Sequence, residues 1–354
     1  MAELGRFLTP RGTSIREVMV RIGSAQGIAL VVDEDRRLLG TVTDGDIRRA
    51  ILAGTDLDRP VETLLEGRPP GYTEPLTAGV GTPDARLLQL MADSSLRHIP
   101  LVNGTGQVED IAVLGDLIRD YESPITAVIM AGGYGTRLRP LTENVPKPML
   151  PVGDKPLLEH TIEQLHGAGI RRLNITTHYK GHVIEEHFGD GSDFGVSIQY
   201  VDEERPLGTA GALGLMERPD EPVLVINGDI VTKVDLQAMV DFHRENRAAM
   251  TVAVRSHEFR VPYGLVETRG VEITAVAEKP VLRSFIIAGI YLLGPEVRSY
   301  IPAGEPCDMS DLIALLLADG RSVVSFPVHE YSSTEGSCGV VRRNPSRSTA
   351  TAGL

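Results

Sequence analysis

The first 120 residues contain two copies of one order of apolar and polar positions. In the first copy, an amphipathic stretch at residues 14–20 precedes two β-rich apolar runs at 27–32 and 38–43 and a helical stretch at 44–53. The second copy repeats this order more loosely, with its elements at 84–92, 98–102, 108–113 and 115–118. The repeat predicts two small α+β units with the same order of helices and strands.

From residue 125 onward, short apolar runs alternate with stretches of helical periodicity. The runs predict strands at 126–130, 173–177, 197–201 and 223–226, with helices at 157–168, 182–188 and 210–215. Such alternation predicts an α/β domain with a mainly parallel sheet, whose ligands bind at the carboxyl ends of the strands. We therefore expect three parts, at residues 1–120, 125–331 and 332–354, the last being a polar and disordered tail.

Composition narrows the function classes. The 354 residues carry a formal net charge of −13, which argues against a nucleic-acid partner because duplex binding relies on many Lys and Arg contacts to phosphates. No window holds the roughly 20 consecutive apolar residues of a membrane span, and the first residues lack a secretory signal. Cys307 and Cys338 are too few for a disulfide framework or a cysteine metal cage. We therefore expect a cytoplasmic protein with no membrane partner.

The clearest chemical signal is the segment at residues 128–152, VIMAGGYGTRLRPLTENVPKPMLPV. Glycines at the end of a strand let the backbone approach a ligand and point N–H groups at phosphate oxygens. Arg137 and Arg139 add charge suited to phosphate, and Lys147 follows between two prolines. The segment lacks the Gly-Lys-Ser/Thr of a Walker A loop. The third glycine of a dinucleotide-binding fingerprint would fall at Leu138, so that interpretation fails as well.

These motifs resemble the sugar-1-phosphate nucleotidyltransferases, a family that includes the mannose-1-phosphate guanylyltransferases. The resemblance continues in family order through Tyr200, Glu203, Pro206-Leu207-Gly208-Thr209-Ala210-Gly211, Asn227-Gly228-Asp229, Tyr263-Gly264, Glu278-Lys279-Pro280 and Ala288-Gly289-Ile290-Tyr291. It implies a Rossmann-like nucleotide-diphospho-sugar transferase domain. It also implies transfer of a nucleotidyl group from an NTP to a sugar 1-phosphate, with release of pyrophosphate, in nucleotide-sugar and polysaccharide biosynthesis.

The resemblance implies four catalytic residues. Arg137 would hold the triphosphate and the leaving pyrophosphate, and Lys147 would contact the α-phosphate or the incoming phosphate. Asp229 would bind Mg²⁺, and Lys279 would bind the sugar phosphate. Asp229 follows an apolar strand, where a magnesium ligand at the edge of the sheet is well placed, although Asn-Gly-Asp is also good turn chemistry.

The remaining implied contacts belong to the nucleotide and the sugar. The nucleotide-binding residues would be Ala131, Gly132, Gly133, Gly135, Thr136, Pro206, Gly208 and Thr209. Gly264 would allow close approach of the sugar and Glu278 would bind a hydroxyl; the alternatives are a turn glycine and an ordinary surface ion pair with Lys279. The three histidines within residues 178–187 lack a further metal ligand, so we interpret them as surface or capping residues.

The N-terminal copies resemble a tandem CBS pair, a module that often binds adenine nucleotides. In the first copy, residues 40–46 match the CBS nucleotide motif, so Asp46 would bind ribose hydroxyls and Thr43 would lie near the phosphate. In the second copy, Asp116 matches Asp46, but Val113 replaces the threonine. This difference favours one adenine-nucleotide site over two. Packing or dimerisation alone is the open alternative, and the module suggests a homo-oligomer by analogy.

Two departures from the family pattern bear on function. Ile287 stands where the family often has an asparagine that can read the sugar. After residues 329–331 the family continues with Trp and an Asp-x-Gly motif that supplies a second magnesium ligand, whereas a Ser/Thr/Arg-rich tail follows here. We therefore expect reduced activity and stability. The alternative functions are a catalytically impaired nucleotide-binding sensor and a transferase for a non-sugar phosphate.

Overall fold

The computed structural model describes residues 4–24, 27–66, 74–94, 96–117 and 122–328, apart from the side chains of Ser24 and Arg137. The chain divides into two compact units, the first Met1–Ser123 with Asp235–Phe242 and the second Pro124–Val234 with His243–Leu354. None of the helices in these described segments is long and apolar enough to cross a membrane.

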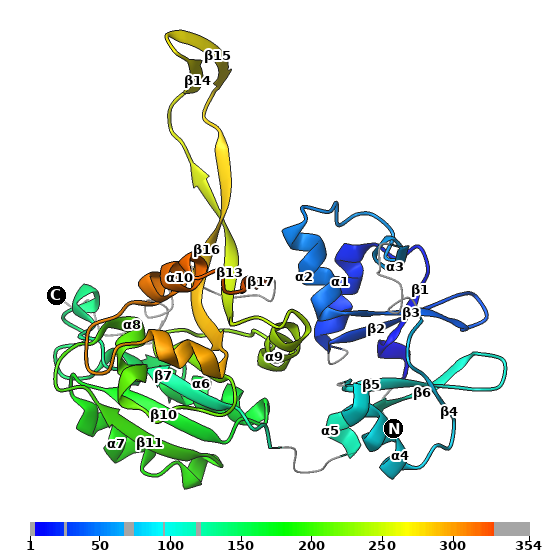
Figure 1. Cartoon of the computed structure of the whole chain (residues 1–354), viewed down its shortest axis with the longest axis horizontal. Helices are drawn as coiled ribbons and strands as arrows, with labels where there is room; N and C mark the ends of the chain where they lie inside the picture. The colour runs from blue at the N-terminus through cyan, green and yellow to red at the C-terminus, as the bar shows by residue number, and fades with distance from the viewer. Residues whose placement is uncertain (1–3, 25–26, 67–73, 95, 118–121, 329–354) are drawn as a thin grey trace, which may run out of the picture. The chain divides into compact units, whose positions relative to one another are not determined.

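The first unit contains two three-stranded sheets of the same design (Figure 1). Its elements are β1 (Leu8–Pro10), α1 (Ile15–Ser24), β2 (Ile28–Val32), β3 (Leu38–Thr43), α2 (Asp44–Leu52) and α3 (Thr63–Glu66), then β4 (Ala78–Gly79), α4 (Asp84–Ser94), β5 (His98–Val102), β6 (Val108–Val113) and α5 (Leu114–Leu117). The pair Ile28–Thr43 recurs as His98–Val113, which sets the repeat at 70 residues. The predicted repeat is confirmed.

One apolar cluster joins the two sheets of this unit. It contains Phe7, Ile28, Leu30 and Val32 from the first copy and Val108, Ile111 and Val113 from the second. Each fully buried side chain of this kind stabilises the fold by about 1.5–3 kcal/mol. The two copies therefore bury apolar surface against each other.

The second unit is built on a seven-stranded sheet with the order β11-β10-β7-β12-β16-β13-β17. Its strands are β7 (Thr126–Met130), β10 (Arg172–Thr177), β11 (Ser197–Asp202), β12 (Val223–Asn227), β13 (Met250–Arg260), β16 (Val281–Leu293) and β17 (Val323–Pro327). Only β16 runs antiparallel to its neighbours, so the predicted mainly parallel sheet is confirmed.

Helices connect these strands. The α-helices are α6 (Leu157–Gly167), α7 (Gly181–Phe188), α8 (Gly208–Gly211), α9 (Leu236–Glu245) and α10 (Met309–Ala318), and the 3₁₀ helices include η2 (Thr136–Leu138), η3 (Lys147–Met149), η5 (Ala212–Leu215) and η6 (Pro295–Tyr300). In α6, Leu158, Ile162 and Leu165 recur at helical spacing and are fully buried. The single helix predicted at 210–215 is instead the end of α8 followed by η5.

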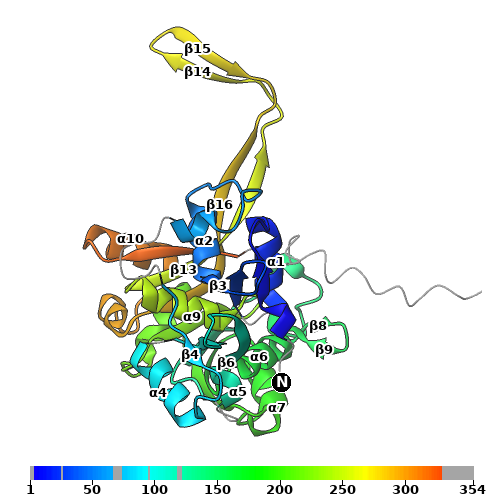
Figure 2. The same cartoon turned by 90° about the vertical axis from the view of Figure 1, so that its right-hand side faces the viewer.

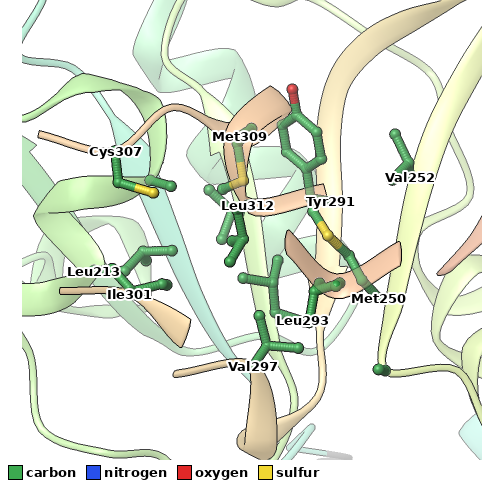
Figure 3. Packing of buried hydrophobic residues seen from close by; sticks show 14 of the residues in the cluster. Leu213, Met250, Val252, Tyr291, Leu293, Val297, Ile301, Cys307, Met309 and Leu312 are labelled. Carbon is green, nitrogen blue, oxygen red and sulfur yellow. The ribbon is translucent and has the colours of Figure 1, made fainter. Parts of the chain in front are cut away.

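The core of the second unit packs α10 and η6 onto the antiparallel part of the sheet. Figure 3 shows Met309 and Leu312 of α10 beside Tyr291 and Leu293 of β16, and all four belong to one buried cluster. This packing fixes β16, and through it the carboxyl end of β12.

Beyond this core, β13 and β16 continue as a two-stranded ribbon, which we call the arm (residues 255–287). Their pairing runs unbroken from Val254–Ile287 to Arg260–Val281, and a second hairpin, β14 (Leu265–Arg269) with β15 (Glu272–Ala277), forms the tip. Every residue of β14 and β15 is exposed. The arm extends away from the rest of its unit (Figures 1 and 2).

Candidate active site

A cavity of about 490 Å³ opens where β7 and β12 end. Its lining includes the predicted nucleotide-binding residues Ala131, Gly132, Gly133, Gly135, Thr136, Pro206, Gly208 and Thr209, together with Lys147 and Asp229. Ten predicted site residues from three separate stretches of sequence therefore meet in one place. A larger cavity of about 920 Å³ begins at the opposite, amino ends of the strands and contains none of them.

The conformation of the glycine loop requires a glycine at position 135. Gly135 adopts a left-handed conformation with φ of 60°, and a Cβ there would lie 2.9 Å from Cγ2 of the buried Thr142. The Thr142 hydroxyl also donates to the Gly135 carbonyl at 2.9 Å. The loop is thus folded tightly back on the segment that leads to Lys147.

Glu203 lies directly beneath the loop. Its side chain is buried, at 6% exposure, and one carboxylate oxygen, Oε2, accepts a hydrogen bond from the Leu207 N–H at 2.9 Å. The other oxygen, Oε1, lies 2.9 Å from the place of a Cβ on Gly132. The sequence motif includes Glu203, but sequence reasoning gave it no role; its fixed place three residues before Pro206 was the available signal.

Lys147 and Asp229 form an ion pair inside the cavity, although 82 residues separate them in sequence. The Lys147 side chain is 17% exposed and that of Asp229 is 40% exposed. Asp229 reaches the cavity because Gly228 passes against β7, where a Cβ would lie 2.8 Å from the Met130 carbonyl. A cationic group and a carboxylate therefore face the same space.

The Asp229 carboxylate suits a divalent cation. The Asn227 side-chain oxygen in the same cavity is buried and has no hydrogen-bond partner in the described structure. Carboxylate and amide oxygens are the ligands that magnesium prefers, and magnesium typically takes only one or two protein carboxylates. Among the described residues, no group of three His, Cys, Asp or Glu side chains is placed to hold a metal.

Gly208 and Thr209 contact the start of α10 closely. Gly208 has φ of 79°, and a Cβ there would lie 2.7 Å from both Asp308 Oδ1 and the Cys307 carbonyl. Thr209 donates from its N–H and its hydroxyl to Asp308, at 3.0 and 3.2 Å, and its hydroxyl accepts from the Met309 N–H at 2.8 Å. The Thr209 hydroxyl is therefore engaged in structure, and the segment's place at the cavity is fixed.

Cys307 is not placed to act as a nucleophile. Burial raises the pKa of its thiol, and Asp311 and Asp308 raise it further, so the reactive thiolate is disfavoured. Its backbone carbonyl instead accepts hydrogen bonds from Ala210 and Gly211. The chemistry of this cavity therefore depends on charge and hydrogen bonding.

Three predicted residues lie elsewhere. Gly264, Glu278 and Lys279 belong to the arm and are not among the residues that line the cavity. Glu278 and Lys279 have highly exposed side chains 3.9 Å apart, and Lys279 has a left-handed φ of 45°, which is strained for a residue with a side chain. From Gly289 to Val281, β16 extends about 26 Å at about 3.3 Å per residue. The structure does not bring the predicted sugar-binding residues to the nucleotide loop.

Two further predictions concern residues that the structure describes only in part. The backbone of Arg137 lies in η2, and the role predicted for its side chain falls outside the described structure. The altered C-terminus at residues 329–354 also lies outside it. Ile287 is described, and its side chain is 47% exposed at the base of the arm.

In the first unit, Asp46 is engaged in local contacts. Its carboxylate accepts hydrogen bonds from the N–H and the hydroxyl of Thr43, at 2.9 and 3.0 Å, which completes a capping box at the start of α2. It also accepts from Arg49 at 2.9 Å. Asp116 occupies the equivalent place on α5 and is exposed.

Comparison with known proteins agrees with this division of the chain. The model of the Nucleotidyl transferase family matches residues 126–331, and that of the CBS domain matches residues 8–53. A mannose-1-phosphate guanylyltransferase of Mycobacterium tuberculosis is 40% identical over 204 residues, covering 55% of this chain and 56% of that protein. A mannose-1-phosphate guanyltransferase of Yarrowia lipolytica is 35% identical over 213 residues (58% of each), and a UTP–glucose-1-phosphate uridylyltransferase of Synechocystis is 36% identical over 219 residues (55% of each).

The chain thus spans about half the length of the curated relatives that it matches. Among solved structures, a UDP-glucose pyrophosphorylase complexed with UDP-glucose is similar with a TM-score of 0.47 and 22% identity, covering 61% of this chain and 97% of that one. HddC from Yersinia pseudotuberculosis is similar with a TM-score of 0.46 and 23% identity, covering 58% of this chain and 92% of that one.

Proposed function

The chain belongs to the Nucleotidyl transferase family, and from that premise we propose that it transfers a guanylyl group from GTP to mannose 1-phosphate. The observation that carries the proposal is the cavity in which the glycine loop, Lys147 and Asp229 meet. The reaction joins two anionic substrates, so a site for it has to neutralise charge and align the reacting atoms more than supply a nucleophile.

The geometry suits an in-line attack of a sugar-phosphate oxygen on the α-phosphorus. The bond from that oxygen to phosphorus forms while the bond to the β-phosphate oxygen breaks, and pyrophosphate leaves with the electron pair. Backbone N–H groups of the glycine loop would bind the triphosphate, and Lys147 would stabilise charge on the α-phosphate. Mg²⁺ held by Asp229 would supply further neutralisation of phosphate charge.

Glu203 supports guanine as the base. An ionised carboxylate only accepts hydrogen bonds, and the Watson–Crick edge of guanine offers two adjacent donors, N1–H and the N2 amino group. Uracil and thymine offer a single N–H between two carbonyl oxygens, which a carboxylate would repel. Glu203 has one oxygen engaged by Leu207 and lines the cavity with the other side of its carboxylate. Mannose 1-phosphate is proposed from the names of the relatives, not from any contact.

A second candidate is a nucleotide-binding protein without transferase activity. The arm favours it, because Lys279 and Glu278 lie away from the cavity and would leave the sugar phosphate without its predicted ligands. The first unit is proposed to bind one adenine nucleotide, at Thr43 and Asp46, and titration of that nucleotide in a calorimeter would test it. A titration whose heat signal does not saturate near one adenine nucleotide per chain would count against that site.

The deciding measurement is pyrophosphate release by the purified chain with magnesium. GTP, dTTP, UTP, CTP and ATP would be crossed with mannose, glucose, glucosamine and heptose 1-phosphates. We expect release with GTP and mannose 1-phosphate, and its loss in Asp229→Ala. Release with another pair would overturn the substrate assignment, and GTP-induced thermal stabilisation without any release would favour the second candidate.

A further inference from the structure

Tyr134, at the tip of the glycine loop, is tied to a residue that no motif singled out. Its hydroxyl lies 2.8 Å from Nε2 of His178, and the two rings meet edge to face with centroids 5.3 Å apart. Tyr179 packs against the same Tyr134 ring at 5.6 Å. Half of the Tyr134 side chain is exposed, so this contact, and not burial in the core, fixes the tip of the loop.

The other side of the His178 ring determines its tautomer. Nδ1 lies 2.6 Å from the Glu203 carbonyl, and a carbonyl oxygen accepts hydrogen bonds but cannot donate them. Nδ1 therefore carries the proton, and in the neutral ring Nε2 is the acceptor. The Tyr134 hydroxyl then donates to Nε2. His178 thus connects the glycine loop to the segment that carries the buried Glu203.

The two residues after His178 hold the far end of the same loop. The Tyr179 hydroxyl donates to the Glu143 carbonyl at 3.2 Å, and the Lys180 ammonium also donates to this carbonyl. The segment at residues 178–180 therefore contacts the loop on both sides of Gly135. Sequence analysis interpreted His178 as a surface or capping residue; the structure shows it hydrogen-bonded through both ring nitrogens.

We propose that His178 is a positioning residue for the nucleotide. By accepting the hydrogen bond from Tyr134, it holds the backbone of residues 132–135 in the conformation that receives the triphosphate. The inference rests on the proposed function of the cavity, and it extends that function to His178, which is not among the residues that line the cavity, through Tyr134, which is. The proposal has a specific consequence. Loss of the contact between Tyr134 and His178 weakens binding of the triphosphate and leaves binding of the sugar phosphate unaffected.

Three single variants separate the two hydrogen bonds of His178. Tyr134→Phe removes only the hydroxyl. His178→Asn places an amide near the position of Nδ1 and keeps the contact with Glu203, whereas His178→Gln reaches the position of Nε2 and keeps the contact with Tyr134. We expect Tyr134→Phe and His178→Asn each to raise the KM for GTP about fivefold, the worth of one neutral hydrogen bond, with the KM for mannose 1-phosphate unchanged. His178→Gln should restore most of the affinity.

Non-additivity completes the test. The double variant Tyr134→Phe/His178→Asn should resemble either single variant, because both remove the same bond. Tyr300→Phe is the matched control: its hydroxyl bonds Asp319 and Arg321, remote from the cavity lining, and its loss should leave the KM for GTP unchanged. Any of three results would overturn the proposal. The effects of the two substitutions on the KM for GTP could multiply in the double variant, the KM for GTP could be unaltered in Tyr134→Phe, or both KM values could rise equally.

Measurement of GTP binding by calorimetry distinguishes failure of this inference from failure of the proposed function. If the wild-type chain binds GTP but releases no pyrophosphate, the proposed transferase function is refuted. The positioning role is then tested by comparing the dissociation constants for GTP of the variants and the wild-type chain. A wild-type chain that binds no triphosphate overturns both proposals. Tyr134→Phe changes a half-exposed side chain, so the test does not depend on a variant that disturbs the core.

Discussion

The cavity beside the glycine loop and the arm carry residues of the same predicted active site, but they are held in very different ways. The cavity is formed by the ends of buried strands: in β7, Ala127, Val128 and Ile129 are no more than 1% exposed. The arm is a two-stranded ribbon in which Val271, Ile273 and Val276 are at least 63% exposed. A two-stranded hairpin without a packing surface is only marginally stable in water.

This difference explains why the predicted residues converge in one region and not in the other. In the cavity, neighbouring parallel strands end at the same edge of the sheet, so spacing in sequence becomes proximity in space. In the arm, no buried side chain fixes the direction of the tip. The first two predictions compare the contribution of Asp229 in the cavity to the reaction with that of Lys279 in the arm. The next two compare the effects of substitution and of acid on stability in the packed part of the unit and in the arm.

The largest effect is expected for Asp229→Ala. Removal of the carboxylate that faces Lys147 should lower the rate of pyrophosphate release roughly a thousandfold, the worth of about 4 kcal/mol of lost transition-state stabilisation. Steady-state kinetics with magnesium measure it. Asp193→Ala, at an exposed acid outside the cavity, is the control and should retain full activity. Equal losses in both variants would contradict the role of Asp229.

Lys279→Ala tests the arm directly. If the arm contributes the sugar-phosphate contact, loss of this charge-assisted hydrogen bond should reduce kcat/KM for the sugar phosphate roughly 10- to 150-fold. The dissociation constant for GTP should not change. Arg269→Ala removes another arm cation and serves as the control. Full activity in Lys279→Ala would show that the cavity works without the arm.

Glycine substitutions compare the rigidity of the two regions. Gly208→Ala combines a left-handed φ with contacts of 2.7 Å, so it should lower the free energy of unfolding by about 2 kcal/mol. Gly264 has no positive φ, and the Cβ added in Gly264→Ala would meet only the flexible Glu278 carboxylate at 3.2 Å. We therefore expect this variant to lower the free energy of unfolding by about 0.5 kcal/mol or less. Urea unfolding measures both. Equal destabilisation would mean that the arm is as tightly packed as the cavity wall.

Acid should affect the core more than the arm. Burial lowers the pKa of His243 to about 4, and its ring lies 2.9 Å from the Thr251 hydroxyl. Between pH 6.5 and 4 the unfolded chain binds a proton that the folded chain does not, so stability falls as pH falls, by up to about 1.4 kcal/mol per pH unit. His243→Gln should flatten this part of the pH profile of unfolding. His257→Gln, at an exposed arm residue, is the control for replacement of a histidine outside the core.

Patterns that are local in sequence predicted both copies in the first unit and strands β7, β10, β11 and β12 of the second, whereas β13, β16 and β17 were not predicted. Alternating apolar runs predicted the parallel sheet, and the order of glycine, Thr-Arg and Pro-Lys-Pro motifs predicted the residues that line the cavity. The contact between Tyr134 and His178 joins residues 44 positions apart and leaves no periodic signal, so it could not be predicted. The placement of the arm could not be predicted either. All residues of β14 and β15 are exposed, so no packing partner fixes where the arm lies.

The ion pair between Lys147 and Asp229 has a consequence for the coupling between metal binding and nucleotide binding. A divalent cation that occupies Asp229 must displace the ammonium of Lys147, and the displaced ammonium then needs a new anion. A phosphate group supplies one, so each ligand removes an electrostatic obstacle to the other. Thermodynamic reciprocity requires the same factor in both directions: metal should tighten nucleotide binding as much as nucleotide tightens metal binding. We therefore expect Lys147 to act as an internal counter-ion that couples the two affinities.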